Sequence, residues 1–291
     1  MIRHGYRQSP IPWSEIDFGN ARGIRISPFP DEEADVLIYY AHGGGFSMGS
    51  AYFYLEFLLA WVTLLQDAGY RNPTVLSLEY SLVPDASYPV QIEQAQSGYV
   101  YACSLVRDSS RICVGGDSAG ATLILSLLFS LARLTKNLEG QKPGFAALIS
   151  PWVTLSSPKN RNTPSDYLNS DSLHLYGRQY AGPEQRLSDP LVSPGMCKDG
   201  KRWAEAAPTA GFGMIFGSEE VLGPELRDLI ALLRDAGCAV SVREEPGAVH
   251  AWPVVTLFLS DTQNERQKGV KDLVKMIKQA IPIQNTNGGA V

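Results

Sequence analysis

Short apolar runs alternate with longer helical patterns over most of this chain. Six runs rich in β-branched and aromatic residues have the length of buried strands, and they cover residues 36–41, 74–79, 111–115, 145–150, 212–216 and 240–244. Helical patterns cover about 51–67, 90–106, 224–236 and 261–280, and another helix begins at Ser118. Such alternation is typical of a mostly parallel sheet with helices on both faces. The pattern therefore predicts an α/β fold.

The segment 151–208 interrupts this alternation. It is rich in Pro, Ser, Asn and charged residues, with one helical pattern around 165–180. Connections inside a compact domain are usually a few residues long, so a segment of this length is best explained as an insertion over one end of the sheet. We therefore expect a single domain over residues 1–291 with a cap-like insertion over about 151–208.

Composition and charge narrow the class of protein. With 44% hydrophobic and 19% charged residues, the chain can bury a sizeable core. The net charge is -5 and there is no basic run, which argues against a nucleic-acid partner. The longest apolar stretch, 119–134, is interrupted by Thr122, Ser126, Ser130 and Arg133. It predicts a buried helix, and no membrane span is expected.

Cysteine usage bears on the cellular compartment. The four cysteines are widely spaced and never form a CxxC pair. In a chain of this length they are more typical of separate thiols than of a disulfide framework or a zinc site. The first ten residues contain no apolar core of signal-peptide length. We therefore expect a cytoplasmic protein without a bound metal.

The candidate nucleophile lies at a strand-to-helix junction. Residues 116–120, GDSAG, match the pattern G-x-S-x-G between a predicted strand and a predicted helix. In that context the pattern forms a strained turn that lifts the Ser118 hydroxyl above the sheet, and the helix N-terminus favours a developing oxyanion. An ordinary serine cap in a glycine-rich turn is the alternative.

A run of glycines directly follows the first predicted strand. Residues 42–46 read HGGGF, and consecutive glycines leave backbone N–H groups uncovered, as an oxyanion hole requires. A flexible turn is the alternative, whereas a phosphate loop is disfavoured because the chain lacks both GxxxxGK[ST] and GxGxxG. Such a loop upstream of G-x-S-x-G is a specific combination.

The base must be one of four histidines. The chain order of this kind of site is nucleophile, acid, histidine, and only His250 follows the last predicted strand. His42 belongs to the glycine loop, where we expect it to fix the loop geometry. His4 lies near the N-terminus and His174 lies in the insertion.

The acid is expected just after a strand between the nucleophile and the histidine. Glu219 and Glu220 follow the strand at 212–216, and either carboxylate could orient the imidazole and stabilise its cation. Asp228 fits less well because it lies inside the next predicted helix. These residues by themselves leave the choice between Glu219 and Glu220 open.

The motifs together resemble the hormone-sensitive-lipase-like group of α/β-hydrolases, also called family IV or the alpha/beta hydrolase fold-3 group. Besides HGGGF and GDSAG, the segments EYSLVPD at 79–85, DPLVSP at 189–194 and EPGAVH at 245–250 resemble that family's motifs. The resemblance runs from about residue 36 to residue 280. It implies the α/β-hydrolase fold and an esterase or short-chain lipase that needs no cofactor and acts on small-molecule esters.

The resemblance also implies roles for single residues. Asp117 would support the strained turn at 116–120, called the nucleophile elbow, and the oxyanion hole would use the N–H groups of Gly44, Gly45 and Ala119. The family's acid lies in an Asp-Pro-Leu or Glu-Val-Leu element, and residues 220–222 read EVL. On this ground Glu220 is preferred to Glu219.

Two features depart from the family pattern. The glycine loop begins at residue 42, whereas relatives have a longer N-terminal region that builds part of a helical cap. We therefore expect a reduced cap, with a pocket that is more open or is closed by the insertion or by a partner. Ser81 stands where the family usually has arginine, which bears on stability more than on chemistry. Phe46 and Trp152 are candidates for lining the pocket, with core packing as the alternative for each.

The predicted reaction is ester hydrolysis through an acyl-enzyme, with His250 as the base for Ser118. Because a fold does not fix a substrate, an acyltransferase, a lactonase or a cyclisation or condensation catalyst is the alternative. A non-catalytic small-molecule receptor is less favoured, because the receptors that resemble this family have lost the histidine. The oligomeric state is left open, with a homodimer as one candidate.

Overall fold

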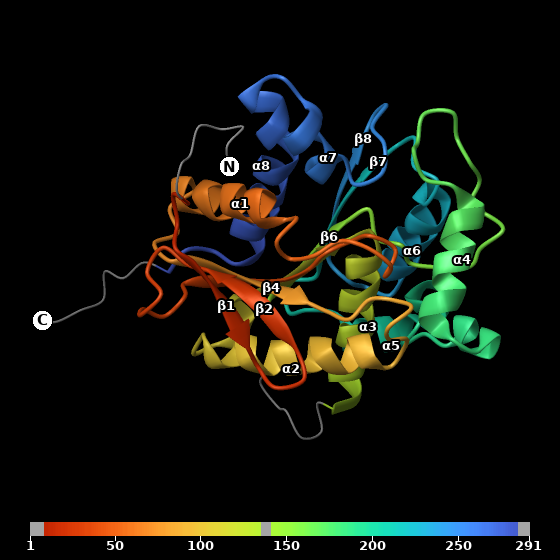
Figure 1. Ribbon diagram of the computed structural model, residues 1–291, viewed down its shortest axis with the longest axis horizontal. Helices are drawn as coiled ribbons and strands as arrows, with labels where there is room; N and C mark the ends of the chain where they lie inside the picture. The colour runs from red at the N-terminus through yellow and green to blue at the C-terminus, as the bar shows by residue number, and fades with distance from the viewer. Residues whose placement is uncertain (1–8, 135–140, 285–291) are drawn as a thin grey trace, which may run out of the picture.

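The computed structural model describes residues 9–134 and 141–284, and an eight-stranded sheet runs through it (Figure 1). The strand order is β1-β2-β4-β3-β5-β6-β7-β8. β2 pairs antiparallel with β1 and with β4, and all pairs from β4 to β8 are parallel. The prediction of an α/β fold with a mostly parallel sheet is confirmed.

Most strands are buried on both faces. The eight strands are β1 (Trp13–Asp17), β2 (Arg22–Ile26), β3 (Val36–Ala41), β4 (Pro73–Glu79), β5 (Ile112–Asp117), β6 (Phe145–Ile149), β7 (Phe212–Gly217) and β8 (Val240–Glu245). Every residue of β3, β5, β6 and β7 is buried. This is why these strands read as continuous apolar runs rather than as alternating patterns.

Helices cover the sheet on both sides (Figure 1). One side carries α1 (Leu55–Asp67), α7 (Trp252–Leu259) and α8 (Gln263–Ala280). The other side carries α2 (Val90–Ser104), α3 (Ser118–Leu134), α5 (Gly200–Ala206) and α6 (Gly223–Asp235). The segment 151–208 contains α4 (Ser170–Ala181), α5 and two short 3₁₀ turns, Glu184–Ser188 and Pro194–Met196.

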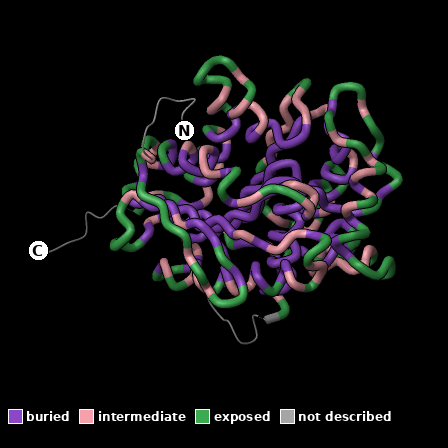
Figure 2. Tube along the Cα trace, viewed as in Figure 1, coloured by how far each residue is buried: buried purple, intermediate pink, exposed green. Residues whose placement is uncertain are grey.

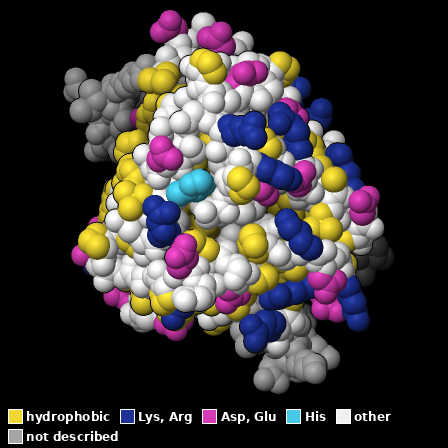
Figure 3. All heavy atoms as spheres, turned by 90° about the vertical axis from the view of Figure 1, so that its right-hand side faces the viewer, with side chains coloured by type: hydrophobic (Ala, Val, Ile, Leu, Met, Phe, Trp, Pro, Cys, Tyr) yellow, Lys and Arg dark blue, Asp and Glu magenta, His cyan; other side chains and the backbone are white. Residues whose placement is uncertain are grey.

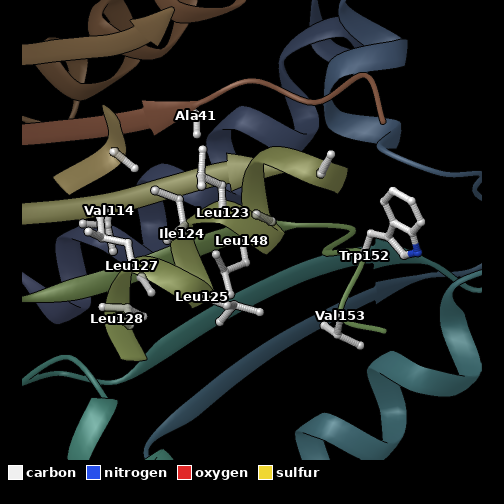
Figure 4. Close-up of a cluster of buried hydrophobic side chains, with 14 of the residues drawn as sticks. Ala41, Val114, Leu123, Ile124, Leu125, Leu127, Leu128, Leu148, Trp152 and Val153 are labelled. Atoms are coloured by element: carbon white, nitrogen blue, oxygen red, sulfur yellow. The ribbon is translucent and has the colours of Figure 1, made fainter. Parts of the chain in front are cut away.

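The core positions the site through α3. Figure 2 shows the buried chain concentrated along the sheet and the helices next to it, with exposed loops around them. In the close-up of Figure 4, Leu123, Ile124 and Leu127 of α3 lie against Val114 of β5 and Leu148 of β6. A fully buried side chain of this size stabilises the fold by about 1.5–3 kcal/mol. α3 is therefore fixed, and so is the residue at its N-terminus.

Several elements were missing from the sequence prediction. β1 and β2 form an edge hairpin, and β1 is mostly exposed, so its residues carry no buried apolar run. α7 is almost uniformly apolar, WPVVTLFL, and therefore has no helical period to read. Among the described residues, no helix is long and apolar enough to cross a membrane.

Charged side chains of both signs cover the face that carries α4 and α6, and hydrophobic side chains lie singly between them over its centre (Figure 3).

A cavity of about 650 Å³ lies between α3 and α5 and is lined by Phe129, Ala132, Arg133, Asp189, Asp199, Lys201, Arg202 and Glu205. Phe129 is eleven residues after Ser118 on α3, which corresponds to about 16 Å along a helix. This cavity is therefore separate from the candidate nucleophile.

Candidate active site

The strand β5 ends at Asp117 and α3 begins at Ser118, so the predicted strand-turn-helix context is present. Ser118 has a φ of 52°, in the left-handed region that residues other than glycine seldom adopt. A Cβ atom on Gly120 would lie 2.1 Å from the carbonyl oxygen of Ala41 and 2.4 Å from that of His42. Glycine at position 120 therefore lets the elbow approach the end of β3.

Asp117 joins the elbow to the glycine loop. Its buried carboxylate accepts hydrogen bonds from the hydroxyls of Tyr40 and Tyr54, both at 2.7 Å, and from the N–H of Gly43 at 2.8 Å. Burial raises the pKa of Asp117, and these hydrogen bonds oppose the increase. No sequence motif pointed to the two tyrosines, because they are 77 and 63 residues away from Asp117.

The glycine loop presents N–H groups beside the elbow. Gly44 and Gly45 have φ values of 108° and 63°, and the Gly44 carbonyl accepts bonds from Ser47 and Met48. No hydrogen bond between described residues uses the N–H of Gly44 or Gly45. Ala119 is the second residue of α3, and N–H groups in the first turn have no partner inside a helix. None of these three N–H groups therefore has a hydrogen-bond partner within the described residues.

His42 holds this loop in place. Its Nδ1 lies 2.7 Å from the carbonyl oxygen of Gly43, and its ring stacks on Tyr80 at 4.4 Å between centroids. The Tyr80 hydroxyl donates to the His42 carbonyl at 2.7 Å. Burial lowers the pKa of His42 to about 4. The ring is therefore neutral near pH 7, and Nδ1 donates to the carbonyl.

Glu220 and His250 meet at the ends of the neighbouring strands β7 and β8. Glu220 Oε2 lies 3.2 Å from His250 Nδ1, and the two side chains are 0% and 3% exposed. Glu219 instead contacts the hydroxyl of its neighbour Ser218 at 3.2 Å and is only partly buried. Of the two glutamates, only Glu220 is in hydrogen-bond contact with the imidazole.

Several carboxylates act on His250. Burial lowers its pKa, but the hydrogen bond and charge of Glu220, together with the charges of Asp166 and Asp117, raise the pKa more. The net result is a pKa above the ordinary value of 6.5. A base with this pKa can accept a proton from a hydroxyl and return it to a leaving group near neutral pH.

Ser150 connects Glu220, the loop that carries His250 and the elbow, and sequence reasoning missed it. Its hydroxyl donates to Glu220 Oε1 at 2.5 Å and accepts from the N–H of Ala251 at 2.9 Å. Two residues later, the N–H of Trp152 donates to the Ser118 carbonyl at 3.2 Å. No hydrogen bond joins the Ser118 hydroxyl to His250 within residues 9–134 and 141–284. Such contacts often tighten only when substrate binds.

The candidate pocket residues Phe46 and Trp152 are both 0% exposed. The Phe46 ring stacks on Tyr180 of α4 at 3.7 Å, which favours the packing alternative for Phe46. Trp152 Nε1 is buried, with no hydrogen-bond partner in the described part of the chain. A Cβ on Gly45 would lie 2.9 Å from the ring of Tyr176, so α4 covers the glycine loop.

The described contacts of this site do not include His174. His174 Nε2 lies 3.3 Å from the carbonyl oxygen of Ser157, and His4 lies outside the described residues. No group of three or more His, Cys, Asp or Glu side chains in the described ranges could hold a metal ion. All four cysteines lie in these ranges, and each is a free thiol.

Residues 38–254, most of the chain, match the family described as alpha/beta hydrolase fold. The chain is 29% identical over 246 residues to the acetyl-hydrolase of Streptomyces hygroscopicus, covering 83% of this chain and 75% of that protein. It is 30% identical over 203 residues to the Schizosaccharomyces pombe protein mug81, covering 67% of this chain and 53% of mug81. The chain thus spans about half the length of that relative.

The fold is also similar to that of solved structures. The crystal structure of EstE7, a homologue of hormone-sensitive lipase from a metagenome library, superimposes with a TM-score of 0.78 at 24% sequence identity. The match covers 96% of this chain and 89% of EstE7. The resemblance to the hormone-sensitive-lipase-like group is confirmed.

Proposed function

The chain belongs to the alpha/beta hydrolase fold family, and we propose that it is a serine esterase that uses Ser118, His250 and Glu220 on small-molecule carboxylic esters. The observation that carries this proposal is the buried contact of 3.2 Å between Glu220 Oε2 and His250 Nδ1. An ionised carboxylate only accepts hydrogen bonds, so Nδ1 carries the hydrogen. His250 Nε2 is then left with the lone pair that a general base needs.

In the first half of the proposed reaction, the Ser118 hydroxyl attacks the ester carbonyl carbon and His250 Nε2 takes its proton. The negative charge that develops on the carbonyl oxygen is stabilised by the N–H groups of Gly44, Gly45 and Ala119 and by the N-terminus of α3. His250 then donates the proton to the leaving alkoxide. An alcohol leaves, and the acyl group is bonded to Ser118.

In the second half, His250 removes a proton from water, which attacks the acyl-enzyme. The acid is released and the proton returns to Ser118. Throughout both halves Glu220 holds the imidazole in one tautomer and stabilises its cation. The hydrogen bonds of Ser150 and Gly217 to Glu220 Oε1 fix the direction of the other oxygen toward His250.

The substrates that we propose are esters of short acyl groups. Tyr176 of α4 lies against Gly45 of the glycine loop, where a Cβ atom would be 2.9 Å from its ring, and this cover favours small acyl groups over large ones. One similar protein is named an acetyl-hydrolase, which supports the same choice. The segment 151–208, which contributes α4, would act as the cap. We also propose a cytoplasmic location, which the four free thiols support.

The test is hydrolysis of p-nitrophenyl esters from acetate to decanoate by the purified protein. Ser118→Ala should lower turnover by about a million-fold. The control Ser104→Ala should leave turnover unchanged, because Ser104 is an exposed serine at the end of α2. An organophosphonate should label Ser118 and no other serine. A folded Ser118→Ala protein with wild-type hydrolysis would refute the proposal. Rapid acyl transfer to added alcohols without net hydrolysis would indicate an acyltransferase instead.

A further inference from the structure

A short stretch of the inserted segment contacts both loops that carry the proposed acid and base. We call residues 163–167 the clamp segment. Within it, Asp166 is 9% exposed. Its Oδ2 accepts the N–H of Val221 at 2.9 Å, and its Oδ1 accepts the N–H of His250 at 3.2 Å. One carboxylate therefore joins the residue after Glu220 to the histidine itself.

The neighbours of Asp166 make the same connection. The Thr163 hydroxyl donates to the carbonyl of Glu219 at 2.8 Å and accepts the N–H of Asp166 at 3.1 Å. The Tyr167 hydroxyl donates to the carbonyl of His250 at 3.2 Å. The clamp segment thus bonds the backbone on both sides of Glu220.

The clamp segment also forms hydrogen bonds with both backbone groups of His250, its N–H and its carbonyl. The Tyr167 ring lies 6.0 Å from the imidazole, at an interplanar angle of 65°. A hydrogen bond of 3.2 Å between an acid and a base is sensitive to small displacements of either loop, and a shift of 1 Å can cost a hundredfold in rate. Anchoring the two loops to the same segment removes that freedom.

The charge of Asp166 has a second effect. The titratable groups that face His250 are the carboxylates of Glu220, Asp166 and Asp117 and the phenol of Tyr167. Asp166 contributes to the raised pKa of His250, after Glu220. Its negative charge therefore favours the imidazolium that forms when Ser118 attacks.

We infer that Asp166 is a positioning residue of the active site, which fixes the Glu220 and His250 loops relative to one another and stabilises the imidazolium as a second carboxylate. This inference rests on the proposed esterase function. Asp166 lies 54 residues before Glu220 in the chain, so part of the geometry of the site would depend on the inserted segment.

The decisive variant is Asp166→Asn, which keeps the shape of the side chain and removes its charge. An amide has one accepting oxygen, so either Val221 or His250 would face an NH₂ group. With p-nitrophenyl acetate, we expect kcat to fall about 10- to 100-fold with little change in KM. We also expect the acidic limb of kcat/KM to lie about one pH unit lower, because the imidazolium loses a stabilising charge.

Two further variants separate charge from geometry. Asp166→Glu keeps the charge but alters the reach, so kcat should fall while the acidic limb stays at its wild-type position. Asp199→Asn is the matched control, since Asp199 also accepts two backbone N–H groups, those of Lys201 and Arg202, at the start of α5 in the same insertion. This control should change neither quantity.

Several results would overturn the inference. One is a wild-type kcat in Asp166→Asn. Another is a lower kcat in Asp166→Asn with the acidic limb of kcat/KM unmoved, which would indicate structural support only. If Asp166→Asn fails to fold in a thermal melt, Asp166→Glu decides, and wild-type kcat in that variant rejects a positioning role. The proposed function is tested separately: if Ser118→Ala is inactive while Asp166→Asn behaves like the wild type, only this inference fails.

Discussion

Replacing Glu220 by glutamine should reverse the tautomer of His250. Glu220 Oε1 accepts hydrogen bonds from the Ser150 hydroxyl at 2.5 Å and from the Gly217 N–H at 2.6 Å. Both partners are donors here, so the oxygen of a glutamine at this position must face them. Its NH₂ group must then face His250 Nδ1 at the position of Oε2, where it donates instead of accepting.

This inversion has a large expected cost. With Nδ1 as an acceptor, the hydrogen of the neutral ring moves to Nε2, which can no longer take a proton from Ser118. A wrong tautomer of this kind costs on the order of ten-thousand-fold in turnover, which corresponds to about 5.5 kcal/mol in the activation barrier. The hydrogen bonds to Oε1 are kept, so the Tm should change by only a few degrees.

The assay is kcat with p-nitrophenyl acetate, measured together with the rate of organophosphonate labelling of Ser118. Glu219→Gln is the matched control, because Glu219 lies in the same loop but contacts only the Ser218 hydroxyl through its side chain among the described residues. It should keep activity within about tenfold, or 1.4 kcal/mol. An inactive Glu219→Gln with an active Glu220→Gln would reverse the roles. Two active variants would mean that the acid lies elsewhere.

Further predictions follow from the surroundings of the site. Because the pKa of His250 is raised above 6.5, kcat/KM should fall with decreasing pH through a midpoint above 6.5; a midpoint below that value contradicts the electrostatic argument. Ser150→Ala should lower kcat about tenfold or more, since Glu220 loses a donor and the Ala251 N–H an acceptor; unchanged kcat would exclude that support. The pKa of His42 is lowered to about 4, so the unfolded chain takes up the proton first on acidification. The free energy of unfolding of the wild type, measured with denaturant, should therefore fall by about 2–3 kcal/mol more than that of His42→Asn between roughly pH 7 and pH 4.5. Equal decreases in the two proteins would refute this assignment.

The sequence predicted the central strands well because they are buried on both faces. The predicted strand at 36–41 agrees with β3, and those at 74–79 and 145–150 differ from β4 and β6 by one residue. A buried parallel strand is a continuous apolar run, which is a local signal. The hairpin of β1 and β2 lacks that signal because β1 is mostly exposed, and β2 pairs with β4, which lies about fifty residues further along the chain.

The same distinction applies to the site. Ser118 and the glycine loop could be proposed because their backbone geometry needs local motifs, and His250 because of its place in the chain order. Tyr40, Tyr54, Ser150 and Asp166 have no such motif, and each reaches its partner across more than fifty residues. Supporting residues of this kind are defined by contacts between loops, which a single sequence does not record.

Backbone strain shows why the supporting contacts matter. Within residues 9–134 and 141–284, the non-glycine residues with positive φ are Phe46, Ser118, Ser150 and Ala251, and all four belong to the glycine loop, the elbow, or the segments beside Glu220 and His250. Each left-handed residue costs about 1–2 kcal/mol, so together they use a large part of a typical net stability of about 5–15 kcal/mol. Such conformations persist only where the surrounding contacts fix them, which here include the bond between Ser150 and Ala251 and the packing of Phe46 on Tyr180. The burial of α3 and of the central strands therefore stabilises a strained arrangement that the local sequence would not adopt alone.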